Sequence, residues 1–267
     1  MFLSSIAVSK VPFFISIEAR SLIALSPLFC HIAMNWSIDF LTIWEIRILF
    51  EMLEVNALEF GFERPLVTGL SFTVPKGQIR LLHGPSGCGK STLLALISGT
   101  PVAGIMWRGD IRLDGVDIGV LAAHRRSVGI IFQHALLFPH LSVGDNLAFG
   151  LAASIKGAAR EAAVHAALAA AGLDGFAARD PASLSGGQAA RVALMRALLA
   201  EPKALLLDEA FSSLDPDLRQ QFGQFVAAQI KLLQIPTLLV SHDAADEEFA
   251  VGPMLQFPIG SAKYARK

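Results

Sequence analysis

Residues 84–91 read GPSGCGKS and directly follow the apolar segment IRLLH at residues 79–83. The spacing G-x-x-x-x-G-K-S between a strand and a helix is typical of a loop that binds phosphate groups. Its glycines let the backbone curve so that N–H groups point inward, and a helix that begins at about Lys90 adds the positive end of its dipole. The residues that we expect around the phosphates are Gly84, Pro85, Ser86, Gly87, Cys88, Gly89, Lys90, Ser91 and Thr92.

Three side chains of this loop, those of Lys90, Ser91 and Cys88, are expected to affect nucleotide binding. The ammonium of Lys90 attracts the β- and γ-phosphates, and the hydroxyl of Ser91 is suited to be a ligand of Mg²⁺. The sequence therefore predicts ATP and Mg²⁺ as cofactors. Cys88 precedes a helix N-terminus, where a thiol is often more acidic than a free one. We expect alkylation of Cys88 to inhibit ATP binding.

The segments around this loop indicate the fold class. Four short, continuous apolar runs are typical of parallel strands that are buried on both faces, namely residues 79–82, 128–132, 204–207 and 237–240. An alanine-rich stretch at residues 157–171, followed by Gly172, predicts a helix between two of them. This alternation predicts an α/β fold with a mainly parallel sheet.

Two adjacent carboxylates follow the apolar run at residues 204–207. Neighbouring residues of a strand point to opposite sides, so Asp208 and Glu209 are expected to have different roles. Asp208 suits the Mg²⁺ shell beside Ser91. Glu209 then faces the nucleotide and is the candidate that polarises the attacking water.

The composition limits the classes of partner. The 267 residues include 22 basic and 23 acidic side chains, for a net charge of −1. A protein dedicated to nucleic acid needs an excess of Lys and Arg, so we expect no nucleic-acid partner. Two cysteines fit a reducing compartment. The mean hydropathy of +0.53 is high and indicates contact with a membrane or a large apolar interface.

Residues 1–51 differ in composition from the rest of the chain. They hold none of the 22 glycines and four of the 39 alanines, but nine of the 20 isoleucines. The charge-free run at residues 21–38 is short for a membrane anchor, and no basic segment precedes the apolar run as in a signal peptide. We favour a reading frame in which translation starts at Met52, and a loosely structured extension or a membrane anchor stays open.

The pentapeptide LSGGQ at residues 184–188 lies 20 residues (208 − 188) before Asp208. With it, the sequence resembles the ATP-binding cassette (ABC) family over nearly all of residues 52–267. Further motifs follow in the family's order: Gln133 matches the Q-loop glutamine, residues 212–215 (SSLD) match the D-loop, and His242 matches the switch histidine.

The fold implied by this resemblance is an ABC-type P-loop ATPase core with a mainly parallel sheet and an N-terminal antiparallel β part. A helical subdomain is inserted at about residues 134–196. Together with the Q-loop, this insert forms a groove that receives a helix of a membrane subunit. The sequence departs from the family at Ala210, where most members have proline, and at Ala189, where a basic or polar residue is usual.

The resemblance also implies where the other site residues act. The family buries ATP between two cassettes arranged head to tail, and the turn that opens the LSGGQ helix is a second anion-binding N-terminus. His242 would contact the γ-phosphate from the side of Glu209, and Gln133 would contact the metal or the attacking water. Residues implied to bind the nucleotide at this interface are Ser185, Gly187, Gln188 and Asp215. Phe60 and Phe62 both qualify to stack on the adenine, and we favour Phe62.

Residues 138–143 with Asn146 resemble small bacterial solute-importer cassettes of the thiamine-type and related uncharacterised group. This implies an ATP hydrolase that dimerises around two Mg-ATP and powers a separate membrane permease as a peripheral subunit on the cytoplasmic face of the inner membrane. Expected partners are the permease, a second, identical cassette and a substrate-binding protein.

The 25 residues (267 − 242) after His242 leave no room for the regulatory domain of sugar importers. The alternative function is a soluble ABC ATPase that acts on nucleic acid or ribosomes. Such proteins carry an inserted coiled coil or two cassettes in one chain, and the sequence shows neither feature.

Overall fold

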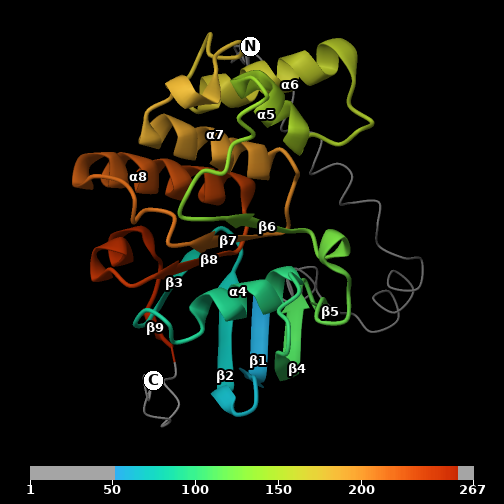
Figure 1. The fold of residues 1–267 in the computed structure, drawn as a ribbon, viewed down its shortest axis with the longest axis vertical. Helices are drawn as coiled ribbons and strands as arrows, with labels where there is room; N and C mark the ends of the chain where they lie inside the picture. Colours follow the sequence, from blue (N-terminus) through green and yellow to red (C-terminus); the bar gives the residue numbers. More distant parts are fainter. Residues whose placement is uncertain (1–51, 258–267) are drawn as a thin grey trace, which may run out of the picture. The chain divides into compact units, whose positions relative to one another are not determined.

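The computed structural model describes residues 52–257, and the expectations for residues 1–51, translation from Met52 included, lie outside this range. Along the chain, helices alternate with strands, and the strands form two sheets (Figure 1). The helices are α4 (Lys90–Ser98), α5 (Val143–Gly150), α6 (Gly157–Ala170), α7 (Gly186–Leu198), α8 (Pro216–Leu233), and the short 3₁₀ helices η1 (Ala123–Arg125), η2 (Pro181–Ser183) and η3 (Ala244–Phe249). None of these described helices combines the length and apolar character that crossing a bilayer requires.

The first described strands form an antiparallel sheet in the order β2-β1-β4-β5. Buried and exposed residues alternate along much of β2, since one face packs on the core while the other is open. The sheet confirms the expected antiparallel part. Its strands are β1 (Met52–Gly61), β2 (Pro65–Pro75), β4 (Met106–Leu113) and β5 (Val116–Asp117).

A second sheet of five strands is parallel throughout, in the order β6-β7-β8-β3-β9. Its three central strands are buried on both faces, which is why their sequences are continuous apolar runs. The α/β fold class is thereby confirmed. The strands are β3 (Ile79–His83), β6 (Val128–Ile131), β7 (Ala204–Asp208), β8 (Thr237–Ser241) and β9 (Leu255–Gln256).

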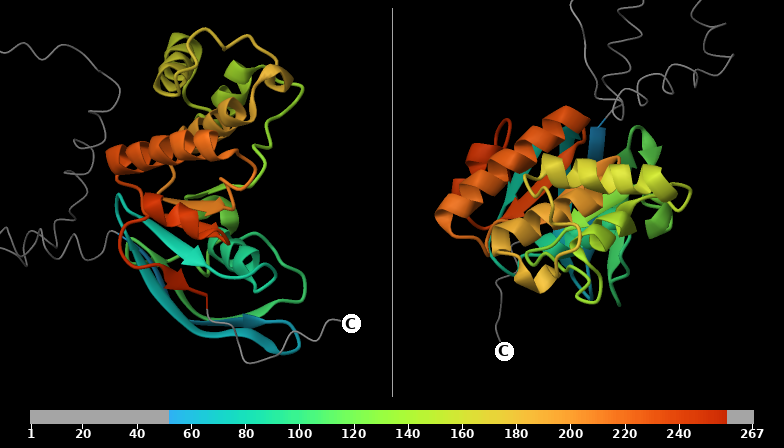
Figure 2. Two further views of the ribbon diagram at one scale, coloured as in Figure 1. Left: turned by 90° about the vertical axis from the view of Figure 1, so that its left-hand side faces the viewer. Right: turned by 90° about the horizontal axis from the view of Figure 1, so that it is seen from above.

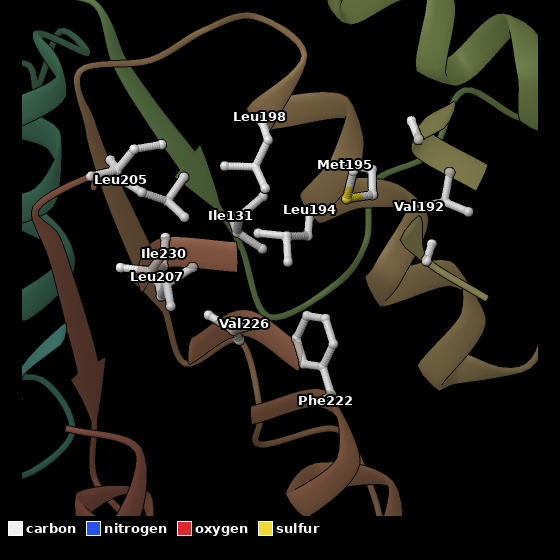
Figure 3. Packing of buried hydrophobic residues seen from close by; sticks show 14 of the residues in the cluster. Ile131, Val192, Leu194, Met195, Leu198, Leu205, Leu207, Phe222, Val226 and Ile230 are labelled. Atoms are coloured by element: carbon white, nitrogen blue, oxygen red, sulfur yellow. The ribbon is translucent and has the colours of Figure 1, made fainter. Parts of the chain in front are cut away.

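Two apolar clusters pack against opposite faces of the parallel sheet. One joins Leu205 and Leu207 of β7 to residues of α7 and α8, such as Leu194 and Phe222 (Figure 3). The other joins Leu206, which points to the opposite face, to the apolar residues of α4 and of the antiparallel sheet. The helix α4 therefore lies between the two sheets.

Three α-helices and the short 3₁₀ helix η2 occupy the connection from β6 to β7. The helix α5 packs on α6 and α7, and α7 also packs on α8 (Figures 1 and 2). The predicted helix at residues 157–171 is confirmed as α6, and Gly172 has the left-handed backbone (φ 67°) that suits a residue following a helix. The chain thus places α5, α6 and most of α7 within residues 134–196.

Candidate active site

The predicted catalytic residues meet at one edge of the parallel sheet. Strands β6, β7, β8 and β3 run in the same direction, so the loops that follow them lie at the same edge, which is where ligands bind in open α/β sheets. Lys90 follows β3, Glu209 follows β7, His242 follows β8 and Gln133 follows β6. Four distant parts of the sequence are therefore brought to one place.

Two glycines give the phosphate loop its shape. Gly87 (φ 78°) and Gly89 (φ 109°) have backbone angles that other residues rarely adopt. A side chain on Gly89 would also collide with Leu66, because its Cβ would lie 2.8 Å from Cδ2 of that residue. The loop therefore turns directly into α4, whose first N–H groups have no partner within the helix.

Lys90 is the first residue of α4, and its side chain folds back over the phosphate loop. Nζ donates to the carbonyl oxygens of Gly84 at 2.8 Å and Pro85 at 2.9 Å. The residue is only 5% exposed. A buried ammonium whose hydrogen bonds go to uncharged carbonyls keeps its charge for an anion, so a phosphate group fits here.

Ser91 and Asp208 offer two oxygens to a cation. The Ser91 hydroxyl donates to Oδ1 of Asp208 at 3.4 Å. Burial, the largest effect, raises the pKa of Asp208, the hydrogen bond from Ser91 lowers it, and the charge of Glu209 raises it. A carboxylate that burial makes harder to ionise gains from a cation beside it, and Mg²⁺ prefers oxygen ligands. The two residues therefore fit Mg²⁺.

Glu209 leaves the strand in a left-handed backbone conformation, with φ of 50°. Its N–H donates to the carbonyl of Val240 at 2.9 Å, and its own carbonyl accepts from the N–H and the hydroxyl of Ser212 at 3.1 and 2.8 Å. These bonds hold a conformation that costs on the order of 1–3 kcal/mol. This turn at the end of β7, rather than strand alternation alone, sets the direction of Glu209 relative to Asp208.

His242 lies beside Glu209, with Nδ1 at 3.2 Å from Oε1. The imidazole is half exposed and the carboxylate is partly exposed. A substrate and a water molecule can therefore reach both groups. The pair is suited to polarise a water and to contact a phosphate next to it.

The Q-loop and the D-loop are joined by one hydrogen bond. The hydroxyl of Ser213 donates to the backbone carbonyl of Gln133 at 3.1 Å. The side chain of Gln133 is exposed, and its role at the metal or the water stays a prediction. Asp215 is the N-cap of α8, and its Oδ1 accepts from the N–H of Leu218 at 3.0 Å. Its expected contact with a nucleotide likewise stays a prediction.

The LSGGQ residues open α7 with a capping box. The hydroxyl of Ser185 accepts from the N–H of Gln188 at 3.3 Å, and Oε1 of Gln188 accepts from the N–H of Ser185 at 3.0 Å. Gly187 is buried, and a Cβ there would lie 3.4 Å from Leu218 of α8. The motif is thus held in place by its own chain, with Ser185 exposed.

The two aromatic candidates for adenine stacking differ in exposure. Phe60 is 1% exposed and its ring packs edge-on to Phe257, so it belongs to the core. Phe62 is 47% exposed. Only Phe62 of the two offers a ring face to a ligand.

The structure corrects the prediction for Cys88. Its side chain is 2% exposed and belongs to the apolar cluster around α4. Burial, the largest effect, raises the pKa of the thiol even though Lys90 lies near it. The expected acidic thiol was wrong, because burial outweighs the helix N-terminus here. That alkylation of Cys88 inhibits ATP binding stays a prediction.

Sequence reasoning missed an ion-pair cluster next to His242. Arg219 of α8 pairs with Asp243 and with Asp246. A signal was available, because Asp243 directly follows His242 and Arg219 lies one helical turn after Asp215.

A groove lies between β6, the loop that follows it, and α7, with a cavity volume of about 360 Å³. We call it the Q-loop groove. Phe132, which the sequence placed in the strand, instead leaves the sheet and is exposed in this groove, as are Leu136 and Phe149. No carboxylate is among its described lining residues, which are Gly129, Ile130, Ile131, Phe132, His134, Ala135, Leu136, Phe138, Phe149, Gly150, Ala193, Arg196, Ala197 and Ala200.

Arg196 is the cation of the Q-loop groove. Its guanidinium donates to the carbonyl of Leu136 at 3.0 Å and to Oδ1 of Asn146 at 3.3 Å, and it lies 5.1 Å from the centre of the Phe138 ring. Burial lowers the pKa of Arg196. All these partners are uncharged, so the groove carries an unneutralised positive charge among apolar side chains.

Comparisons with known proteins indicate the family of the chain. The family model described as ABC transporter matches residues 67–212. The uncharacterized ABC transporter ATP-binding protein YnjD of Escherichia coli (strain K12) is 51% identical over 184 residues, which cover 69% of the chain and 85% of that protein.

Two import proteins are also similar. The sulfate/thiosulfate import ATP-binding protein CysA of Burkholderia mallei is 43% identical over 65% of the chain and 50% of its own length. The Fe(3+) ions import ATP-binding protein FbpC 1 of Rhodococcus jostii is 45% identical over 72% of the chain and 55% of its own length. The chain thus spans about half the length of these two relatives.

Proposed function

Since the chain belongs to the ABC transporter family, we propose that it is the ATP-hydrolysing subunit of a solute importer. As an ABC ATP-binding protein the chain is an ATP hydrolase. Import is supported by the similarity to the sulfate/thiosulfate and Fe(3+) import proteins. The observation that carries the proposal is the meeting of Lys90, the Ser91–Asp208 pair and the Glu209–His242 pair at one edge of the sheet.

In this function, Lys90 and the N–H groups of the phosphate loop bind the phosphates of ATP. Ser91 and Asp208 hold Mg²⁺, with Gln133 near the metal or the water, and the bound ion neutralises charge on the phosphate oxygens. Glu209 polarises the attacking water, and His242 contacts the γ-phosphate from beside it. The exposed ring of Phe62 stacks on the adenine.

Hydrolysis takes place between two copies of the chain. Ser185, Gly187 and Gln188 of each copy face the γ-phosphate bound by the other, with Asp215 at the same interface. The exposure of Ser185 supports this arrangement, because a phosphate can approach the N-terminus of α7 there. We take residues 52–267 as one ABC ATP-binding domain with a helical subdomain at about residues 134–196.

The membrane partner is a permease that inserts a helix into the Q-loop groove. Exposed Phe132, Leu136 and Phe149 offer apolar contact. The charge of Arg196, bonded to uncharged groups, favours a helix that carries a carboxylate. The chain then acts at the cytoplasmic face of the membrane as a peripheral subunit. A substrate-binding protein on the other side delivers the solute.

The test is to purify the tagged full chain from detergent-solubilised native membranes and identify what accompanies it. We expect a multi-spanning membrane protein, and a co-purifying substrate-binding protein would support import. Recovery with ribosomes or nucleic acid alone would contradict the transport proposal and favour a soluble ABC ATPase. A parallel assay of Mg²⁺-dependent ATP hydrolysis tests the enzymatic activity independently of the membrane partner.

A further inference from the structure

The cluster of Arg219, Asp243 and Asp246 joins α8 to the segment that follows β8. Nη1 of Arg219 donates to Oδ2 of Asp243 at 2.5 Å. Its Nη2 and Nε both donate to Oδ1 of Asp246, at 2.6 and 2.8 Å. One guanidinium therefore bridges two carboxylates, and the planar fork of arginine fixes the direction of these bonds, whereas the rotatable donors of a lysine ammonium do not.

Asp246 makes the cluster rigid. It lies in η3 and is 2% exposed, and inside the protein its carboxylate is paired with Arg219. Figure 2 shows η3 (red) packed beside α8 (orange), and the two helices are in contact. The guanidinium is thereby held in one position relative to the sheet edge.

Asp243 is the member of the cluster that directly follows His242 in the sequence. Besides the bond from Arg219, its Oδ1 accepts from the N–H of Ala245 at 2.9 Å and its own N–H donates to the hydroxyl of Ser241 at 3.0 Å. The residue is therefore fixed on three sides. The hydrogen bond from Ala245, followed by that from Arg219, lowers the pKa of Asp243, so the carboxylate stays ionised near neutral pH.

His242, by contrast, has little packing of its own. It is half exposed, and the contact that the structure gives its ring is with Glu209. The position of its own backbone therefore matters for this contact, and Asp243 is the next residue along that backbone. We infer that Arg219 is a positioning residue, which fixes Asp243 and thereby holds the imidazole of His242 against Glu209. This inference rests on the proposed role of Glu209 and His242 in ATP hydrolysis.

The same arginine connects His242 to the D-loop. The backbone N–H of Arg219 donates to the carbonyl of Asp215 at 2.8 Å, within the first turn of α8. Ser213 of the D-loop is in turn bonded to Gln133. Hydrogen bonds thus link Arg219 to Asp215 of the D-loop, and Ser213 of the same loop to Gln133.

Two variants of the full chain test the inference. Arg219→Lys keeps the charge but replaces the planar fork by one nitrogen with rotatable donors, which does not hold both carboxylates in the same geometry. Asp243→Asn turns an amide toward the guanidinium and leaves Asp246 its bonds to Arg219, so it protects the fold if the first variant is unstable. Misplacing a reacting group by about 1 Å costs up to roughly a hundredfold in rate, so we expect kcat for ATP hydrolysis to fall roughly ten- to a hundredfold in both variants.

The KM for ATP should change less than about twofold, since Lys90 and the phosphate loop are untouched. Arg160→Lys is the matched control. Arg160 donates to the backbone carbonyls of Ile155 and Ala148 in the helical part of the chain, far in sequence from β8. We expect its kcat to equal that of the unaltered chain.

A double-mutant cycle with His242→Ala distinguishes an effect on the position of His242 from a general loss of structure. If Arg219 acts through His242, neither Arg219→Lys nor Asp243→Asn lowers the residual rate of His242→Ala chains further, as followed with radiolabelled ATP. An equal fall in both backgrounds, or an unchanged kcat in folded Asp243→Asn, overturns the inference. A His242→Ala chain with the unaltered rate would instead overturn the proposed role of His242 itself.

Discussion

The imidazole Nδ1 of His242 lies 3.2 Å from Oε1 of Glu209, although the residues are 33 positions apart (242 − 209). They meet because β7 and β8 are neighbours in a parallel sheet and each residue follows its strand directly. In the proposed function, the carboxylate that would polarise the water thus lies next to the imidazole that would contact the γ-phosphate.

The first prediction concerns the carboxylate of this pair. Glu209→Gln keeps the shape and the backbone bonds but removes the charge that polarises water. We expect ATP to bind with unchanged affinity, the closed dimer to accumulate on a sizing column, and kcat to fall at least roughly a hundredfold.

The control for this variant is Glu161→Gln, which changes an exposed carboxylate on α6. It should hydrolyse ATP at the unaltered rate. Turnover close to normal in Glu209→Gln would remove Glu209 from the reaction.

The second prediction follows from the buried carboxyl of Asp208. Burial raises its pKa, so in the pH window between the unfolded and the folded value the folded chain binds more protons than the unfolded chain. Stability therefore falls as pH rises through this window. At neutral pH the ionised carboxylate destabilises the nucleotide-free chain.

Asp208→Asn should accordingly raise the melting temperature at neutral pH, on the order of 2–4 °C per kcal/mol gained. The gain should shrink at acidic pH, where Asp208 itself is protonated. The same variant should also lose Mg²⁺-dependent ATP hydrolysis, because Asp208 is a proposed ligand of the ion. Asp174→Asn, an exposed aspartate outside the site, is the control for melting. A lower melting temperature in Asp208→Asn at neutral pH would contradict the destabilising role of the charge.

The parallel sheet could be predicted from sequence because its central strands are buried on both faces and leave continuous apolar runs. The observed β7 and β8 each extend one residue beyond the predicted runs, and β6 ends one residue earlier. Phe132 is apolar but exposed, and the apolar pattern could not separate a core residue from one in a surface groove.

The other features that the sequence did not predict have a common physical cause, which is contact between residues that are distant in the sequence. Arg219 meets Asp246 across 27 positions of sequence, so the cluster depends on how α8 packs on η3. For Cys88, the local rule for a helix N-terminus was available, but the burial that overrules it comes from distant strands. Likewise, the left-handed turn at Glu209 is held by hydrogen bonds to Val240 and Ser212. Because no glycine stands at this position, the sequence pattern did not predict the turn.

The third prediction concerns Cys88. Because the thiol is buried and its pKa is raised, we expect N-ethylmaleimide to modify it slowly in the native chain and rapidly in urea. Mass spectrometry of the peptide that contains Cys88 measures this rate directly. Rapid modification of the native chain, slowed by ATP, would show that the thiol is reachable and would restore the original expectation.

The last prediction tests the Q-loop groove with a matched pair of surface residues. Phe149 is 65% exposed and lines the groove, while Leu232 is 63% exposed on α8 and is not among its lining residues. Phe149→Glu and Leu232→Glu therefore place the same charge at equally exposed apolar positions. Neither should change the melting temperature or the ATP affinity of the chain, because neither side chain is buried.

Only Phe149→Glu should lose the membrane protein in a purification from detergent-solubilised membranes. The new carboxylate removes an apolar contact from the groove and neutralises the charge of Arg196. A partner helix with its own carboxylate would then meet repulsion. Equal recovery of the membrane protein by both variants would mean that the permease binds elsewhere. Equal loss would mean that added negative charge alone, rather than the groove, governs recovery.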